Sequence, residues 1–113
     1  MGLVDSSQLD ARSPLPGWTG CFFHSENMTF AYWDITADAA PLHEHHHSNE
    51  EVWHVVEGTL AITVDGTELV VGPGCAALVP PDTPHSARAL SDARAIVVDH
   101  PLRLQLPGSG SAA

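Results

Sequence analysis

The sequence predicts an all-β domain, folded as a sandwich or a closed barrel, on two observations. Short runs rich in β-branched and aromatic residues recur along the chain, with turn signals between them. Almost no stretch shows the 3.6-residue apolar period of an amphipathic helix. Eight such runs fall within about eighty residues, a spacing typical of β-sandwiches and closed barrels.

The expected strands can be placed by the turns that bound them. They are residues 21–24, 28–35, 51–56, 59–64, 67–71, 75–79, 85–90 and 94–99. Asp65 and Gly66 stand between two alternating runs and predict a two-residue hairpin. Residues 72–74 (GPG) and 80–84 (PPDTP) are further breaks, because proline cannot donate a hydrogen bond to a sheet.

The chain is predicted to be a single domain over residues 1–113, since this length can bury one modest core. Residues 1–17 are polar and interrupted by proline, so we expect an N-terminal arm, with the β-barrel over 18–104. Residues 105–113 are rich in glycine and serine and are expected to be a flexible tail. Residues 30–33 are apolar on both strand faces, and an outer apolar face favours a homodimer.

The charge of the chain excludes some classes of partner. The formal net charge is -10, with only four Lys plus Arg residues, so no basic surface for nucleic acid or an anionic membrane can be assembled. No apolar run approaches the ~20 residues of a transmembrane helix, and the first residues lack the pattern of a signal peptide. We therefore expect a cytoplasmic protein whose partner is a small molecule.

The most informative stretch is a histidine cluster. Four of the eight histidines lie within residues 43–47. Side chains two positions apart in a strand share a face, which places His43, His45 and His47 together. Neighbouring imidazoles on one face can converge on a single metal ion, and a carboxylate a few residues further on can join them. The cluster therefore predicts a metal site.

The spacing alone leaves two ligand sets open. One set is His43 and His45 with Glu50, and the other is His45 and His47 with Glu51. The alternation of side chains along a strand does not decide between these sets. The next strand, residues 52–56, carries apolar residues on both faces, so its core-facing side cannot be identified.

Two motifs resemble those of the cupin family. His45-x-His47-(x)3-Glu51-(x)6-Gly58 is similar to the first cupin motif, and Gly58 fits only if Glu51 is the carboxylate. Downstream, Gly74-(x)5-Pro80-x-Asp82-(x)2-His85 resembles the second. The resemblance covers roughly residues 28–100 and implies a cupin-type double-stranded β-helix, or jelly-roll barrel. It also implies the metal ligands: His45, His47, Glu51 and His85.

A metal site of this kind leaves coordination positions open for a substrate. Three imidazoles and one carboxylate leave two positions open on a six-coordinate ion, whereas structural zinc sites are closed. The ligand types suit one divalent transition metal, which could be Fe, Mn, Ni, Co, Cu or Zn. We expect an enzyme acting on a small oxygenated organic molecule, either a dioxygenase (an oxidoreductase) or a metal-assisted isomerase or lyase. The alternative is a non-catalytic module that binds a metal and a small ligand.

Other polar residues carry weaker expectations. Trp53 shares the face of Glu51 and is expected beside the ligands, whereas Arg88 is expected at the surface. No catalytic residue can be assigned beyond the ligands, since the acidic candidates qualify by type only; they are Asp34, Glu50, Asp82 and Asp99. Five histidines are expected to lie outside the ligand set: His24, His43, His46, His54 and His100.

Overall fold

Ten β-strands make up the regular structure of residues 2–104, the part of the chain that the computed structural model describes. With one 3-10 turn, the elements are η1 (Ser6–Gln8), β1 (Arg12–Leu15), β2 (Trp18–His24), β3 (Thr29–Ile35), β4 (Leu42–His45), β5 (Glu50–Glu57), β6 (Leu60–Val64), β7 (Thr67–Val71), β8 (Ala76–Val79), β9 (His85–Ala89) and β10 (Ala93–His100). These residues include no α-helix, and so none that could cross a membrane. The tail expected over 105–113 lies outside the described residues.

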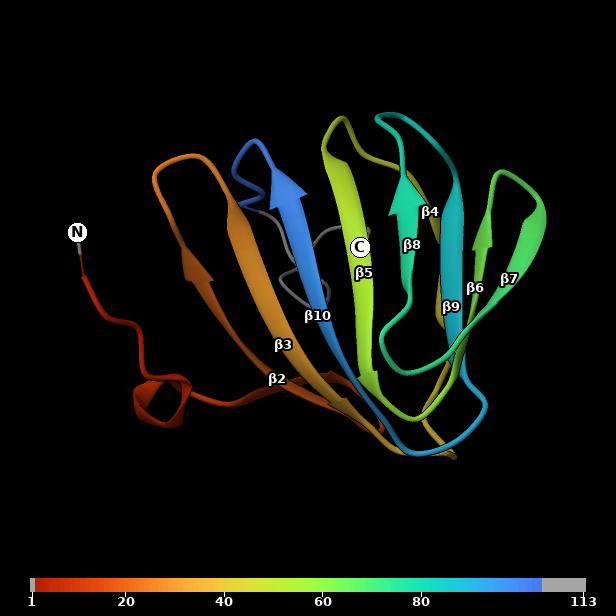
Figure 1. Ribbon diagram of the computed structural model, residues 1–113, viewed down its shortest axis with the longest axis horizontal. Coiled ribbons are helices and arrows are strands. Elements are labelled where there is room, and N and C mark those ends of the chain that lie inside the picture. The colour runs from red at the N-terminus through yellow and green to blue at the C-terminus, as the bar shows by residue number, and fades with distance from the viewer. Residues whose placement is uncertain (1, 105–113) are drawn as a thin grey trace.

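The strands form two antiparallel sheets. One has the order β1-β2-β3-β10-β5-β8 and the other the order β4-β9-β6-β7. In Figure 1 the first sheet runs from β2 at the left to β8, and β9, β6 and β7 follow at the right. From β3 onward every connection except the β6–β7 hairpin crosses from one sheet to the other. This alternation is the jelly-roll arrangement, so the expected fold class is confirmed.

All eight strands expected from the sequence are present, as β2, β3 and β5 to β10. Two further strands fall outside these eight runs, although strand geometry was already expected for the histidine cluster. Strand β4 forms inside the histidine cluster, and β1 forms inside the stretch interpreted as an arm. Strand β1 contains Pro14 and lies at the edge of its sheet, where proline is tolerated because no hydrogen bond is required of it. Residues 12–15 therefore belong to the barrel.

The core lies between the inner faces of the sheets. Burial alternates along β3, β5 and β10, as expected for strands with one face toward the core. Trp18 packs edge-to-face against Trp33 and Trp53, with ring centroids 5.5 and 6.1 Å apart. On the outer face Leu78 is 67% exposed and Val56 is 43% exposed. That apolar face suits a second subunit, and the homodimer stays a prediction.

Two turns depend on left-handed backbone conformations. The β6–β7 hairpin turns at Asp65 and Gly66, whose φ angles are 49° and 80°, which confirms the two-residue hairpin. Gly58, between β5 and β6, has a φ of 72°. A Cβ atom added to Gly58 would lie 1.9 Å from the carbonyl oxygen of Asp92. This turn therefore requires glycine for its conformation and for its close backbone approach.

Candidate metal centre

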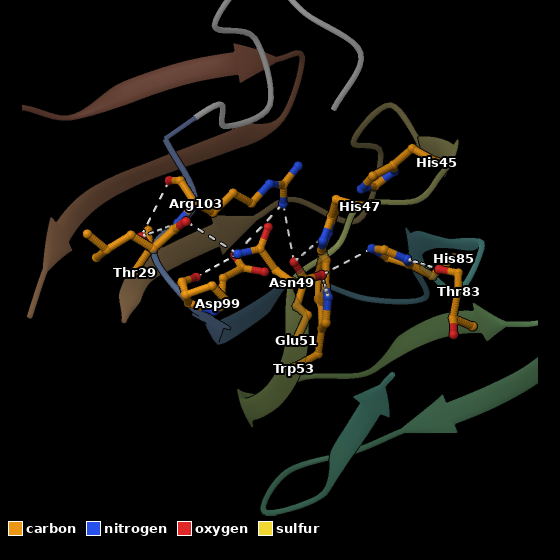
Figure 2. A network of polar contacts seen from close by, with 12 residues as sticks. Thr29, His45, His47, Asn49, Glu51, Trp53, Thr83, His85, Asp99 and Arg103 are labelled. Carbon is orange, nitrogen blue, oxygen red and sulfur yellow. Dashed lines mark hydrogen bonds and ion pairs between the residues drawn. The ribbon is translucent and has the colours of Figure 1, made fainter. Parts of the chain in front are cut away.

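Four side chains from three strands and one loop meet near one end of the barrel. His45 ends β4, His47 lies in the following loop, Glu51 is the second residue of β5, and His85 begins β9. His45 and His85 are opposed across the β4–β9 pairing. Figure 2 shows the imidazoles of His47 and His85 turned toward Glu51, with His45 beside them. The structure thus brings together the four residues that the cupin resemblance implied.

The distances within this cluster are short. The ring centroid of His85 lies 4.3 Å from that of His45 and 5.0 Å from that of His47. Potential ligand atoms of the three histidines all lie within 4.8 Å of one another. The carboxylate of Glu51 places Oε2 3.1 Å from Nε2 of His47 and Oε1 3.2 Å from Nε2 of His85. The three imidazoles thus form one candidate ligand group, and the Glu51 carboxylate contacts two of them.

The hydrogen bonding of the imidazoles leaves nitrogen atoms available. Nδ1 of His45 lies 2.9 Å from the carbonyl oxygen of His43, and Nδ1 of His85 lies 2.8 Å from that of Thr83. If each Nδ1 carries the proton, each Nε2 presents its lone pair to the cluster. Among the described residues, the buried Nε2 atom of His45 has no hydrogen-bond partner, and those of His47 and His85 have none besides the Glu51 carboxylate. Buried polar atoms without a partner are uncommon, and a cation would satisfy all three.

The protonation states also suit a cation. Burial lowers the pKa of His45 to about 4, which keeps this imidazole neutral at pH 7. Burial would raise the pKa of Glu51, but contacts with His47, His85 and Asp99 outweigh it and hold that pKa well below its usual range. For Asp99, burial raises the pKa to about 9, and the neighbouring Glu51 adds to the effect. The metal-free site therefore pairs an ionised Glu51 with a protonated Asp99.

A second group of residues surrounds Glu51. The indole Nε1 of Trp53 donates a hydrogen bond to Oε1, and Nη1 of Arg103 donates one to Oε2 at 3.2 Å. Trp53 thus lies where the sequence predicted. The same Nη1 atom is 3.8 Å from Oδ2 of Asp99. The buried carboxylate of Glu51 is therefore oriented on both oxygens, as expected for a residue that must hold a fixed position.

A small cavity of about 20 Å³ adjoins the cluster. Its walls combine the polar groups of His45, Glu51, Asp99 and Arg103 with the rings of Trp18 and Trp33. This volume is about what one water molecule requires. The site is closed to large molecules in this conformation.

The solvent exposure of the remaining histidines and of Arg88 can be compared with what the sequence predicted. His24, His46, His54 and His100 are exposed, as is Arg88, which pairs with Glu68 at 3.3 Å. The expectation that His43 shares the ligand face was wrong. The pairs Leu42–Ala87 and His45–His85 leave one extra residue in β4, a bulge that turns His43 outward.

Sequence reasoning missed Arg103, which belongs to no motif, and named Asp99 only as one of four acidic candidates by residue type. Their positions depend on how the end of β10 meets β5. A weak signal for Asp99 was available, because it lies two and four residues after Val97 and Ala95, on the inner face of β10.

The fold and the cluster define a class: a small jelly-roll barrel with a candidate three-histidine, one-carboxylate metal site. The chain belongs to the cupin family, since the family model described as "Cupin domain" matches residues 32–101. No curated protein matches the chain.

Solved structures of cupins share the fold. KdgF from Halomonas sp. is 22% identical with a TM-score of 0.84, and the match covers 92% of this chain and 96% of that one. An RmlC-like cupin from Shewanella frigidimarina has the same identity and TM-score over 92% and 94% of the two chains. Bacillus subtilis oxalate decarboxylase, which has Mn(II) centres, is 21% identical with a TM-score of 0.76, over 93% of this chain and 32% of its own. At these identities the likeness shows the fold alone.

Proposed function

We propose that this chain is an enzyme that binds one divalent transition metal ion through His45, His47, Glu51 and His85. Its substrate would be a small oxygenated organic molecule. The observation that supports the proposal most directly is the convergence of three buried Nε2 atoms beside Glu51. That of His45 has no hydrogen-bond partner in the described residues, and those of His47 and His85 face only the Glu51 carboxylate. A bound ion would supply Lewis-acid activation of a carbonyl or hydroxyl oxygen.

The reaction class that fits best is metal-assisted proton transfer, as in isomerases and lyases. Its support is the position of Asp99, which is 1% exposed and whose Oδ1 atom has no hydrogen-bond partner among the described residues. Potential ligand atoms of Asp99, Glu51 and His47 lie within 4.8 Å of one another. A carboxyl group so close to the cluster can exchange a proton with a molecule held there.

Metal content tests the first half of this proposal. Untagged protein reconstituted with Mn(II), Fe(II) or Zn(II) should retain about one ion per chain by elemental analysis. Glu51→Gln should weaken metal affinity by about 10- to 100-fold, whereas the exposed neighbour Glu50 provides the matched control Glu50→Gln, which should not. Retention of less than about a tenth of an ion per chain would exclude the site. A larger effect of Glu50→Gln would favour the other ligand set.

Isotope exchange tests the reaction class. Metal-loaded protein is incubated in deuterated water with 1,2-diones and keto acids, and NMR follows exchange at the carbon beside the carbonyl. Asp99→Asn should slow that exchange by about 100-fold or more at unchanged metal content. Consumption of dioxygen by the protein loaded with a redox-active metal, without isotope exchange, would instead make the chain a dioxygenase.

A further inference from the structure

Arg103 is a buried cation in a strongly acidic chain. The sequence contains four arginines and no lysine. Among the described residues, Arg12, Arg88 and Arg94 are exposed, whereas the side chain of Arg103 is 8% exposed and lines the cavity beside the metal cluster. Burying a guanidinium costs free energy unless its charge interacts with an anionic group. The fold thus places its one buried arginine at the candidate site.

The backbone of Arg103 is anchored on both sides. Oγ1 of Thr29 accepts a hydrogen bond from the Arg103 amide at 2.9 Å and donates one to its carbonyl at 3.4 Å. Nδ2 of Asn49 donates to the carbonyl oxygens of Pro101 at 2.6 Å and Leu102 at 3.4 Å. Thr29 and Asn49 are themselves buried. Asn49 lies between His47 and Glu51 in the chain, so the ligand loop and the segment carrying Arg103 are tied together (Figure 2).

The guanidinium uses only part of its hydrogen-bonding capacity. Its protein contacts, to Glu51 at 3.2 Å and to Asp99 at 3.8 Å, are both made by Nη1. Within residues 2–104, Nε and Nη2 of Arg103 have no acceptor. A guanidinium offers five N–H groups in a planar fork that matches a carboxylate in a two-bond contact. One edge of this fork is therefore available to a ligand beside the cluster.

The charge balance favours an anion at this position. A divalent ion at the cluster would be neutralised by Glu51 only in part, because the three imidazoles are uncharged as ligands. Arg103 adds a second positive charge, and Asp99 can offset at most one. The loaded site would thus keep a net positive charge in a buried setting, where electrostatic attraction is stronger than in water.

From these observations, and resting on the proposed function, we infer that Arg103 binds the carboxylate of a small 2-oxo or 2-hydroxy acid whose other oxygen faces the metal cluster. The cavity of about 20 Å³ holds about one water molecule, so the pocket must widen to admit the acid. Its apolar walls, formed by Trp18, Trp33 and Leu42, would cover the carbon skeleton. Arg103 is the specificity-determining residue in this scheme.

Calorimetry of acid binding to metal-loaded protein tests the inference. Pyruvate and glycolate are the probes, and pyruvamide and glycolamide are uncharged analogues of nearly equal shape. Wild-type protein should bind the acids at least about 10-fold more tightly than the amides. Arg103→Gln should weaken acid binding by about 10- to 100-fold and leave amide binding unchanged. Arg103→Lys should recover part of the loss, and the exposed Arg94→Gln should have no effect.

A separate titration with Mn(II) distinguishes the possible failures. Arg103 also contacts Glu51, so Arg103→Gln is compared with wild type at saturating Mn(II), where both proteins hold the metal. If Arg103 binds the acid, the saturated variant should still lose its preference for acids over amides. If the residue only positions Glu51, the saturated variant should bind the acids as tightly as wild type, which would overturn the inference. Equal binding of acids and amides, or no binding of either by metal-loaded wild type, would also overturn it. Failure of wild type to bind Mn(II) or another divalent ion would refute the proposed function itself.

Discussion

Glu51 is the residue on which the candidate site depends. It is 1% exposed, and its two oxygens receive hydrogen bonds from Trp53 and Arg103 while two histidine nitrogens approach within 3.2 Å. An isolated buried carboxylate would be strongly destabilising, so the ionised form must be stabilised by these neighbours. The carboxyl of Asp99 beside it cannot ionise as well at low cost, because two buried like charges repel.

The Glu51–Asp99 pair predicts a pH dependence for the metal-free protein. Burial raises the pKa of Asp99 to about 9 from 3.8, so the folded state holds a proton that the unfolded chain has lost above about pH 4. Stability should then fall as pH rises between 7 and 9, with a slope of up to about 1.4 kcal/mol per pH unit. Asp99→Asn should flatten this fall, as measured by urea unfolding in the presence of a chelator.

Other titratable side chains decide the pH range of this measurement and provide its control variant. Below about pH 6.5 the lowered pKa of His45 acts in the opposite direction, because the unfolded chain then binds a proton that the folded state does not. The comparison therefore starts at pH 7. Burial acts to lower the pKa of His85, but its contact with Glu51 raises that pKa overall, so His85 adds to the fall above pH 7 in wild type and Asp99→Asn alike. Asp82→Asn changes an exposed carboxylate and should leave the slope as in wild type. A slope equally steep in Asp99→Asn would contradict the assignment.

At this scale the sequence could predict the four clustered side chains but not their surroundings. Spacing left two ligand sets open, and the resemblance to the cupin motifs implied His45, His47, Glu51 and His85. The structure gathers these four side chains, although metal binding itself stays a prediction. Arg103 contacts Glu51 across 52 positions of the chain. Such a contact depends on how β10 lies against β5 and leaves no local pattern to read.

Strand irregularities decide where the ligands point. Parity along a regular strand placed His43 with His45, but the bulge in β4 adds a residue between Leu42 and His45 and makes these two face inward. Bulges of this kind redirect side chains next to functional sites. The strands themselves were predictable because β-prone runs and turns alternate so regularly, whereas β1 has only four residues and contains a proline.

The turn between β5 and β6 gives a prediction at the level of elements. Gly58 combines a φ of 72° with an approach to Asp92 that leaves no space for a Cβ atom. Gly66 has a similar φ of 80° but nothing within 4 Å of its added Cβ. Gly66→Ala should therefore cost only the conformational penalty of about 1–2 kcal/mol. Gly58→Ala should cost clearly more, because the backbone of residues 92–93 must also shift.

Urea unfolding of the two variants beside wild type measures this difference. The comparison isolates the steric contribution, since both substitutions add the same methyl group to a left-handed glycine. Equal losses of stability would mean that the β5–β6 turn relaxes freely. That result would remove the reason for a glycine at the end of the first motif.

At the scale of the whole molecule, the cluster joins the two sheets. His45 and His85 belong to the four-stranded sheet, Glu51 belongs to the six-stranded sheet, and His47 lies in the connection between them. The site thus lies where one sheet faces the other and depends on both. A ligand that binds all four residues would hold the two sheets together. Because the four residues meet only in the folded state, the ligand would bind that state and not the unfolded chain.

Metal addition should therefore stabilise the entire barrel. An ion present at about 100 times its dissociation constant adds about 2.7 kcal/mol, which corresponds to a rise in Tm of roughly 10 °C for a domain of this size. Calorimetry with and without chelator measures the rise. His85→Ala and Glu51→Gln should each reduce it by about half or more although they lie in different sheets, whereas the exposed His54→Ala should retain it. Amide exchange should slow in β5 and β9 alike on metal binding, and slowing confined to one sheet would show that the ion does not bridge them.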